Sequence, residues 1–257
     1  MKPLLPIAGT SLLHRTIALG RRAVADSDAQ LVVATDDGRI AAHAEAVGCA
    51  AVMTAPDIST GSGRALAAAR AQGAAPEMVV NLQGDSPFQS PAALAAIIRS
   101  LRAGDADVAT PVVRLSWAAL DALRAHKQAA PFSGTTCVRR ADGRALWFSK
   151  AVLPAIRGED TLRAGGGPSP VWRHVGLYAY RYRALEAFEA SEPTDLERLE
   201  GLEQLRLLEL GLTIDAVAVE PSRFDISGID TAADIARAEA LIAEHGDPLE
   251  QLSVRFE

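Results

Sequence analysis

The 257 residues are enough to bury a sizeable core, and 49% hydrophobic with 23% charged residues is typical of a soluble globular protein. The formal net charge of −6 disfavours a general nucleic-acid binder, because surfaces that follow phosphate backbones are usually basic. The sequence contains neither a signal-like apolar run after Met1 nor a stretch long enough to cross a bilayer, so we expect a cytoplasmic protein with no membrane partner.

Helices and strands alternate in the first hundred residues. The clearest start and stop signals are Ser90, which suits an N-cap, Pro91 in the first turn and Gly104 at the end. Two cysteines, Cys49 and Cys137, lie far apart in apolar surroundings, and we expect reduced core thiols without a catalytic role. The periodicity predicts helices over 11–25, 37–48, 59–71 and 90–104, with strands over 30–36, 49–53 and 78–83 between them.

The pattern changes to short β-rich pieces over residues 108–182. It returns to helices over 195–210 and 232–244, with a strand over 213–219 between them. Such alternation predicts an α/β fold with a mostly parallel sheet flanked by helices, and ligands beyond the carboxyl ends of the strands. Because the sequence has no internal repeat and no linker, we expect one composite domain over residues 1–257, with the β-rich segment inserted.

The stretch "VVNLQGD" places polar groups at the tip of a core strand. Gly84 lets the backbone come close to a ligand, and the carboxylate of Asp85 is well placed to hold a divalent cation. The same "GDSP" letters are also good turn chemistry. The residues alone leave both interpretations open.

A second acidic position lies in "ISGIDTAAD". Asp230 follows an apolar pair and precedes a helix whose capping pattern is Thr231 with Asp234 three residues on. Capping alone explains the pattern equally well. Two aspartates at the ends of core elements nevertheless make a better metal site than either one.

The helix expected over 195–210 carries a carboxylate on an apolar face. Glu203 projects into this face, and a buried carboxylate costs on the order of several kcal/mol unless it is paired. Arg206 could pair with it, or Glu203 and Gln204 could face a polyhydroxylated ligand. The leucines that share the face are Leu196, Leu199, Leu207 and Leu210.

The strand-like "WRHVGLYAYR" gathers polar and aromatic side chains. Strand alternation places Arg173 opposite His174, whereas Tyr178 and Tyr180 share the face of His174. A lone strand histidine is commonly a satisfied structural residue. The whole group, with its two tyrosines, would suit the carboxylate and hydroxyls of a sugar acid.

A third polar stretch, "STGSGRALAAA", leads into a helix whose first turn contains Arg64. Its backbone N–H groups could bind a base or a phosphate, although a plain flexible turn fits as well. The sequence has no Walker lysine motif, no dinucleotide-binding glycine fingerprint, no HExxH and no CxxC. Zinc chemistry is therefore not expected.

Several segments together resemble the 3-deoxy-manno-octulosonate (Kdo) cytidylyltransferases, also called CMP-Kdo synthetases. "RHVGLYAYR" and "LEQLRLLELG" are the specific ones, whereas "QGD" is shared more widely among sugar nucleotidyltransferases. The segments appear in the family's order from Lys2 to Ile242. They are "KPLLPIAGTSLLHRTI", "VVATDD", "VVNLQGDSP", "ALWFSKAVLP", "RHVGLYAYR", "LERLEGLEQLRLLELG" and "ISGIDTAADIARAEALI".

The resemblance implies a nucleotide-diphospho-sugar transferase-like fold and a reaction in which the anomeric hydroxyl of Kdo attacks the α-phosphate of CTP. The products are CMP-Kdo, for lipopolysaccharide or surface-polysaccharide synthesis, and pyrophosphate. Asp85 and Asp230 match the family's Mg²⁺ ligands, and Lys2 matches a lysine at the triphosphate. Gln83 and Arg64 lie in segments that contact the nucleotide.

The resemblance also implies a sugar-binding set and a homodimer formed through the β-rich segment. His174, Glu203 and Gln204 match the positions that hold the sugar. The remaining matches are less specific. They are Tyr178, Lys150 and Arg157.

Three positions depart from the family's pattern. The family usually has glutamate at Ser86 and an acidic residue at Gly63, so the nucleotide pocket is expected to differ in detail. Family members also begin with a strand and a loop of the form A-R-x-x-S-x-R-L-P-G, and Met1 stands at its glycine. We expect the chain to lack that strand and most of the triphosphate loop, to bind CTP weakly and to turn over slowly or not at all.

Two alternatives remain. The same chemistry could act on another sugar acid, with a different sugar pocket around the same aspartates. The chain could also be a non-catalytic homologue that binds a nucleotide, a sugar or a partner. Pyrophosphate release from CTP discriminates between an enzyme and a binding protein.

Overall fold

The computed structural model describes the chain except for Met1, Asp26, Ala74, residues 225–227, Asp230 and residues 254–257, and it describes 251–253 by backbone alone. The chain forms two compact units, and each is described separately. The first unit comprises Met1–Ala95 with Ser222–Glu257, and the second comprises Ala96–Pro221. The prediction of one composite domain over residues 1–257 stays a prediction.

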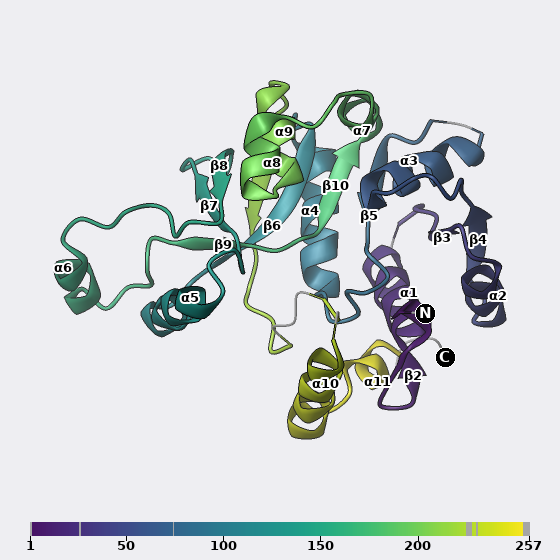
Figure 1. The fold of residues 1–257 in the computed structure, drawn as a ribbon, viewed down its shortest axis with the longest axis horizontal. Coiled ribbons are helices and arrows are strands. Elements are labelled where there is room, and N and C mark those ends of the chain that lie inside the picture. The colour runs from purple at the N-terminus through teal and green to yellow at the C-terminus, as the bar shows by residue number, and fades with distance from the viewer. Residues whose placement is uncertain (1, 26, 74, 225–227, 230, 254–257) are drawn as a thin grey trace. The chain divides into compact units, whose positions relative to one another are not determined.

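The first unit contains the alternating helices and strands that the periodicity predicts (Figure 1). β3 and β4 pair in parallel, and α2 connects them in a βαβ arrangement. The unit consists of a 3₁₀ turn η1 (Lys2–Leu4), β1 (Pro6–Ile7), β2 (Thr10–Ser11), α1 (Leu12–Val24), β3 (Val32–Thr35), α2 (Gly38–Ala46), β4 (Ala50–Met53), α3 (Gly61–Ala71), β5 (Met78–Asn81), the start of α4 (Pro91–Ala103), α10 (Ala232–His245) and α11 (Pro248–Ser253).

The helices begin where polar side chains accept hydrogen bonds from first-turn N–H groups. Ser11 accepts from His14 at the start of α1, and Thr231 and Asp234 form the predicted capping box of α10. Ser90 Oγ accepts the N–H of Ala93 at 3.3 Å, which confirms the predicted start of α4. Local sequence therefore determines these boundaries.

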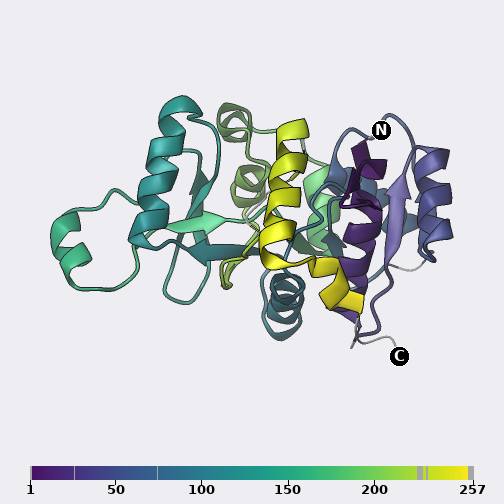
Figure 2. The ribbon, with the colours of Figure 1, turned by 90° about the horizontal axis from the view of Figure 1, so that it is seen from below.

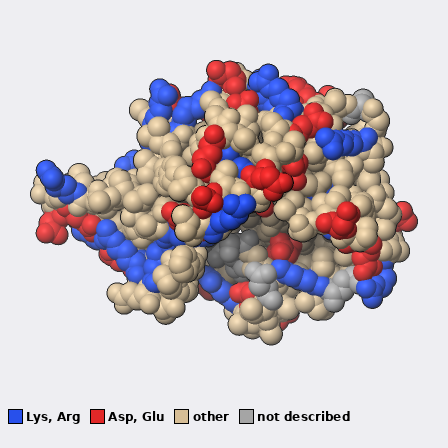
Figure 3. Space-filling model, turned by 45° about the horizontal axis from the view of Figure 1, so that its top comes forward, with Lys and Arg blue, Asp and Glu red and all other residues tan. Residues whose placement is uncertain are grey.

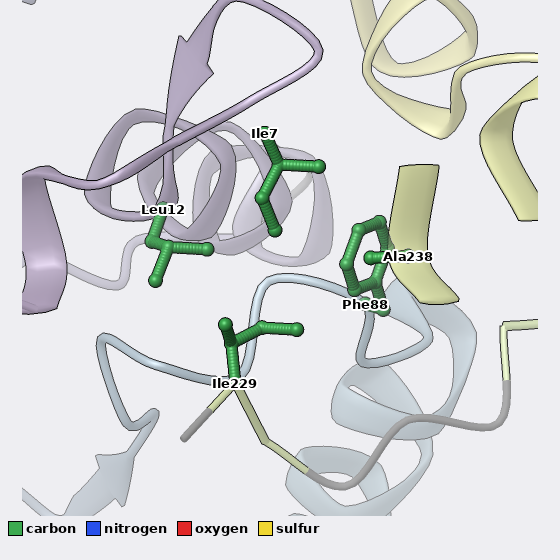
Figure 4. Close-up of a cluster of buried hydrophobic side chains, with 5 residues drawn as sticks. All are labelled: Ile7, Leu12, Phe88, Ile229 and Ala238. Carbon is green, nitrogen blue, oxygen red and sulfur yellow. The ribbon is translucent and has the colours of Figure 1, made fainter. Parts of the chain in front are cut away.

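A buried cluster in the first unit joins its two sequence segments. Phe224 stacks on Phe88, with 5.3 Å between ring centroids. Arg15 of α1 is 2% exposed and makes a bidentate ion pair with Asp247 at 2.7 and 2.8 Å, which holds α11 beside α1 (Figure 2). The buried side chains are Ile7, Leu12, Phe88, Ile229 and Ala238 (Figure 4).

The second unit is built on β6, which has partners on both edges. β11 pairs with β6 in parallel, β10 and β9 pair with it antiparallel, and β7 joins β9 to β8. The elements are β6 (Val108–Arg114), α5 (Trp117–Ala129), β7 (Thr136–Arg139), β8 (Ala145–Ser149), α6 (Glu159–Ala164), β9 (Trp172–His174), β10 (Tyr178–Arg181), α7 (Tyr182–Glu189), α8 (Asp195–Glu200), α9 (Glu203–Glu209) and β11 (Ile214–Ala218).

This architecture confirms the α/β class with a sheet flanked by helices (Figure 1). β3/β4 and β6/β11 are parallel pairs, whereas the antiparallel pairs of β7 to β10 lie in the segment predicted to be β-rich. That segment also contains α5, which the pattern analysis missed. Its signals are present, since Ser116 caps it and Leu120 is buried one turn inside.

The single helix predicted over 195–210 is wrong. Gly201 adopts a left-handed conformation with φ of 62°, which ends α8 and lets α9 begin two residues later. The break changes the rotational phase, so the expected leucine face does not exist. Leu199 is 74% exposed and Leu210 is 42% exposed.

Two surface features bear on partners. None of the helices in the described ranges has both the length and the apolarity needed to span a bilayer. On the face shown in Figure 3, acidic and basic side chains are interspersed, so a positively charged binding site on this face would have to be local.

Cys49 and Cys137 are buried and unbridged, as predicted, and burial raises the pKa of the Cys137 thiol to about 12.

Candidate functional site

In the first unit, the carboxyl end of β5 carries predicted site residues. Asp85 lies just beyond β5, and its Oδ2 is 2.7 Å from Lys2 Nζ of η1. Both side chains keep about a third of their surface exposed, at 30% and 34%. A carboxylate and a lysine that lie together at the carboxyl end of a strand can bind a charged ligand.

The backbone of Asp85 is bound to the C-terminal segment. The N–H of Ile229 donates to the Asp85 carbonyl at 3.0 Å, and Thr16 Oγ1 of α1 donates to the Gly84 carbonyl at 3.3 Å. Asp230, the second predicted acidic residue, is the next residue after Ile229 and lies outside the described residues. The pairing of Asp85 with Asp230 therefore stays a prediction, supported by the position of Ile229.

Arg64 is fixed by groups that follow β3 and β4. Its guanidinium donates to Thr54 Oγ1 at 2.6 Å and to the Ile58 carbonyl at 2.8 Å, and it lies 3.3 Å from Asp36 Oδ2. The first turn of α3 also approaches β5, since a Cβ built on Gly61 would lie 3.8 Å from Gln83 Nε2. Gln83 itself is exposed.

We call Lys2, Arg64, Gln83 and Asp85 the Asp85 cluster. Its members come from η1, α3 and the segment after β5. α3, whose first turn contains Arg64, contacts β3, β4 and β5. A Cβ at Gly61 would lie 3.3 Å from Asn81 Nδ2, so a side chain there would need this amide to move by a few tenths of an ångström.

In the second unit, His174 ends β9 among aromatic rings. Its ring meets Phe148 edge-on at 5.2 Å and Tyr178 at 5.4 Å between centroids. Burial lowers the pKa of His174 to about 3, with a smaller contribution from the positive charge of Lys150. The imidazole is therefore neutral at physiological pH.

Glu203 and Gln204 begin α9, and Glu203 lies close enough to Tyr178 for its charge to act on the phenol. Glu203 reaches solvent, yet the surrounding protein raises the pKa of its carboxyl. Burial raises the pKa of Tyr178, and the charge of Glu203 adds to this rise. Gln204 is 3% exposed, and its Nε2 has no hydrogen-bond partner among the described residues.

Arg206 is not the partner of Glu203. Its Nε lies 2.9 Å from Glu197 Oε2, its guanidinium carbon lies 3.8 Å above the centroid of Phe188, and it donates to the Ser191 carbonyl at 2.7 Å. The structural alternative for Glu203, an ion pair with Arg206, is therefore not formed. The bend at Gly201 is the reason, because it turns Arg206 towards α8.

Lys150 joins this group, whereas Arg157 does not. Lys150 Nζ donates to Thr135 Oγ1 at 3.2 Å, and its backbone N–H donates to Glu200 Oε2 at 2.7 Å. Burial lowers the pKa of Lys150, and the charge of Glu200 opposes this. Arg157 is exposed, and the described residues offer it no hydrogen bond or ion pair.

We call Lys150, His174, Tyr178, Glu203 and Gln204 the His174 cluster. Sequence reasoning found its members but missed Phe148, Thr135, Glu200 and a further neighbour, Thr110, whose Oγ1 lies 2.8 Å from His174 Nε2. All four act through contacts between strands or between a strand and a helix. The sequence has no periodic or motif signal for such contacts.

Comparisons with known proteins cover nearly the whole chain. A family model described as "Cytidylyltransferase" matches residues 1–214, which contain every member of both clusters. The chain is 38% identical over 247 residues to "3-deoxy-manno-octulosonate cytidylyltransferase" of Maricaulis maris (strain MCS10), covering 96% of this chain and 92% of that protein. The protein of the same name from Xylella fastidiosa (strain 9a5c) is 40% identical over 250 residues, covering 95% and 91%.

A solved structure is also similar. It is described as CMP:2-keto-3-deoxy-manno-octonic acid synthetase complexed with CTP. The TM-score is 0.79 with 29% sequence identity, and the match covers 95% of this chain and 92% of that one. Fold and sequence thus agree over the same length.

The low pKa of His174 predicts acid-sensitive stability. The pKa is about 3 in the folded chain against 6.5 ordinarily, so the unfolded chain binds the extra proton between these values. The stabilisation that the folded chain gains from its neutral His174 is complete above pH 6.5 and declines as the pH falls, by up to about 1.4 kcal/mol per pH unit. When the pH falls from about 7.5 to about 5.5, the free energy of unfolding should decrease in both proteins. We expect the decrease in His174→Gln to be smaller than in the unchanged chain, by on the order of 1 kcal/mol.

Urea unfolding at both pH values measures this difference. The matched control is His126→Gln, which alters an exposed histidine of α5 and should leave the pH dependence as it is. Parallel pH dependences for His174→Gln and the unchanged chain would contradict the prediction.

Proposed function

Because the chain belongs to the cytidylyltransferase family, and within it to the 3-deoxy-manno-octulosonate cytidylyltransferases, we propose that it transfers CMP from CTP to the anomeric hydroxyl of Kdo. The hydroxyl oxygen attacks the α-phosphorus, the bond from this phosphorus to the bridging oxygen breaks, pyrophosphate leaves, and the hydroxyl proton is released. The observation that carries the proposal is the match over more than nine tenths of the chain at 38–40% identity. We also propose that the protein carries out this reaction in the cytoplasm.

The Asp85 cluster supports a role in binding CTP. Nucleotidyl transfer depends mainly on positioning and on neutralising phosphate charge, which cationic groups at strand ends can do. Lys2 and Arg64 supply positive charge, and Gln83 is an exposed amide beside the N-terminus of α3. Arg64 is already fixed by three neighbours, so little side-chain entropy is lost when a phosphate or base binds it.

Asp85 fits a magnesium ion by the chemistry of its donors. Mg²⁺ prefers oxygen ligands and is commonly bound by one or two carboxylates together with substrate phosphates. Within the described ranges, no group of three or more His, Cys, Asp or Glu residues forms a complete protein cage. Asp85 and Asp230 would hold the ion, which supplies charge neutralisation at the triphosphate.

The His174 cluster supports a role in holding the sugar acid. A neutral histidine, a carboxyl with a raised pKa and an unpaired buried amide are groups that hydrogen-bond hydroxyls. Lys150 adds a positive charge for a carboxylate, and its ammonium is held by a hydroxyl rather than by an acid. Leaving Gln204 Nε2 unpaired costs about 1–3 kcal/mol, which a ligand acceptor would recover.

Incubation with CTP, magnesium and a panel of sugar acids tests the function directly. Pyrophosphate release with Kdo but not with other sugar acids supports the proposal. Release with a different sugar acid would change the substrate. Absence of release with every member of the panel would favour a non-catalytic protein.

Asp85→Asn should abolish most transfer because it removes the negative charge that would hold the metal. We expect the rate of pyrophosphate release to fall by more than about 100-fold while the melting temperature changes little. Asp57→Asn is the matched control, since Asp57 is an exposed aspartate of the same unit. Near-normal turnover of Asp85→Asn, still dependent on magnesium, would place the metal elsewhere.

Glu203→Gln should act on the sugar acid and not on CTP. The change keeps the shape but removes the acceptor charge, so we expect the KM for the sugar acid to rise by about tenfold and that for CTP by less than about twofold. Glu192→Gln, at an exposed residue, is the control. A large loss of stability with unchanged kinetics would show that Glu203 is structural.

We further propose that the protein is a homodimer formed through the β-rich segment. Phe132 and Leu146 of this segment are 69% and 53% exposed, which suits burial against a second copy. Sedimentation should give a dimer, and Phe132→Ser with Leu146→Ser should shift it towards monomer, whereas Leu199→Ser should not. A monomeric parent chain would refute this interface.

A further inference from the structure

A proline interrupts the ladder between β6 and its β9–β10 edge. Ala179 pairs with Ala109, which sets Leu177 opposite Pro111, whereas Arg173 pairs with Val113, which sets Val175 opposite the same proline. Because both Val175 and Leu177 lie opposite Pro111, the chain between β9 and β10 forms a bulge. The Val175 N–H donates to the Pro111 carbonyl at 3.0 Å, but proline has no N–H to return to the Leu177 carbonyl.

The hydroxyl of Thr110 supplies the missing donor. Its Oγ1 lies 2.8 Å from the carbonyl of Leu177 and 3.3 Å from that of Val175. Leu177 is 1% exposed, and Thr110 provides the hydrogen bond that its carbonyl receives within the described part of the chain. Because a buried carbonyl without a donor is costly, the single hydroxyl proton of Thr110 belongs in this bond.

His174 must then donate to Thr110. Nε2 lies 2.8 Å from the same Oγ1, and the hydroxyl proton is already used, so the oxygen can only accept there. Nε2 carries the ring proton, and Nδ1 carries a lone pair. Nδ1 makes no hydrogen bond to any residue that the structure describes. The positive charge of Lys150 favours the neutral ring, in which this nitrogen keeps its lone pair.

We propose that Thr110 is a positioning residue that holds His174 as the Nε2–H tautomer, so that Nδ1 accepts a hydrogen bond from a hydroxyl of the sugar acid. The sugar half of this inference rests on the proposed function, whereas the tautomer half rests on the fold alone. The site then distinguishes sugar acids by whether they carry a hydroxyl that can donate to Nδ1. A sugar acid without that hydroxyl would leave Nδ1 unpaired.

Nitrogen NMR of the imidazoles tests the tautomer without any substrate. The chain has five histidines, and His174→Gln assigns the signals of this ring. We expect Nδ1 to have the pyridine-type shift and Nε2 the pyrrole-type shift in the unchanged protein. The reverse assignment, or a protonated ring near neutral pH, would overturn the inference.

Two variants of Thr110 separate positioning from packing. Thr110→Ser keeps the hydroxyl and should keep the tautomer, whereas Thr110→Val keeps the volume and should give a mixture of tautomers. For transfer, we expect Thr110→Val to raise the KM for the sugar acid by about tenfold with CTP unchanged, and Thr110→Ser to restore it. If Thr110→Val does not fold, the signals of the unchanged protein and of Thr110→Ser still decide the tautomer.

The outcomes distinguish this inference from the proposed function. The expected tautomer with an unchanged KM for the sugar acid in Thr110→Val would refute the role of Nδ1 in binding. Equal losses for the sugar acid and for CTP would show that Thr110 acts only through the fold. A parent chain that releases no pyrophosphate with any sugar acid would refute the proposed function and the sugar half, while the tautomer would still be measured.

Discussion

The hydrogen bond from the Ile229 N–H to the Asp85 carbonyl joins two segments that are more than a hundred residues apart in sequence. It brings Ile229 to the end of β5, where the carboxylate of Asp85 lies. The packing around it is apolar and nearly complete, with Ile7 and Leu12 at 0% exposed and Ile229 at 1%. The position of the Asp85 backbone is therefore tied to a buried core.

The second unit positions its polar groups by a different constraint. β6 contains a proline, and the lost N–H is replaced by a threonine hydroxyl that also contacts a histidine. A defect in backbone pairing thus selects the tautomer of a histidine side chain. A valine at the position of Pro111 would restore the ladder donor and free the Thr110 proton, which could then go to His174. The proline and the histidine are thus chemically coupled through Thr110.

Sequence patterns predicted the first unit well because caps and periodicity are local. Ser11, Ser90 and Thr231 each accept a hydrogen bond within the first turn that follows them, so a short window contains the whole signal. The bend at Gly201 was missed because glycine is tolerated inside helices, and only tertiary packing selects its left-handed conformation. The pairing of Arg206 with Glu197 follows from that bend and could not be found without it.

The candidate residues were found by motif resemblance, but their electrostatic states were not. A protein with a net charge of −6 that binds anionic substrates needs cations whose charge is not cancelled by nearby acids. Lys150 meets this need in part, because its ammonium donates to a hydroxyl, while the nearby acid Glu200 accepts its backbone N–H and acts on the ammonium only through its charge. Arg64 is held largely by a hydroxyl and a carbonyl, with Asp36 at the longer distance of 3.3 Å. Neutral acceptors thus fix the direction of these two cations at little cost in charge, whereas Lys2 is held by the carboxylate of Asp85.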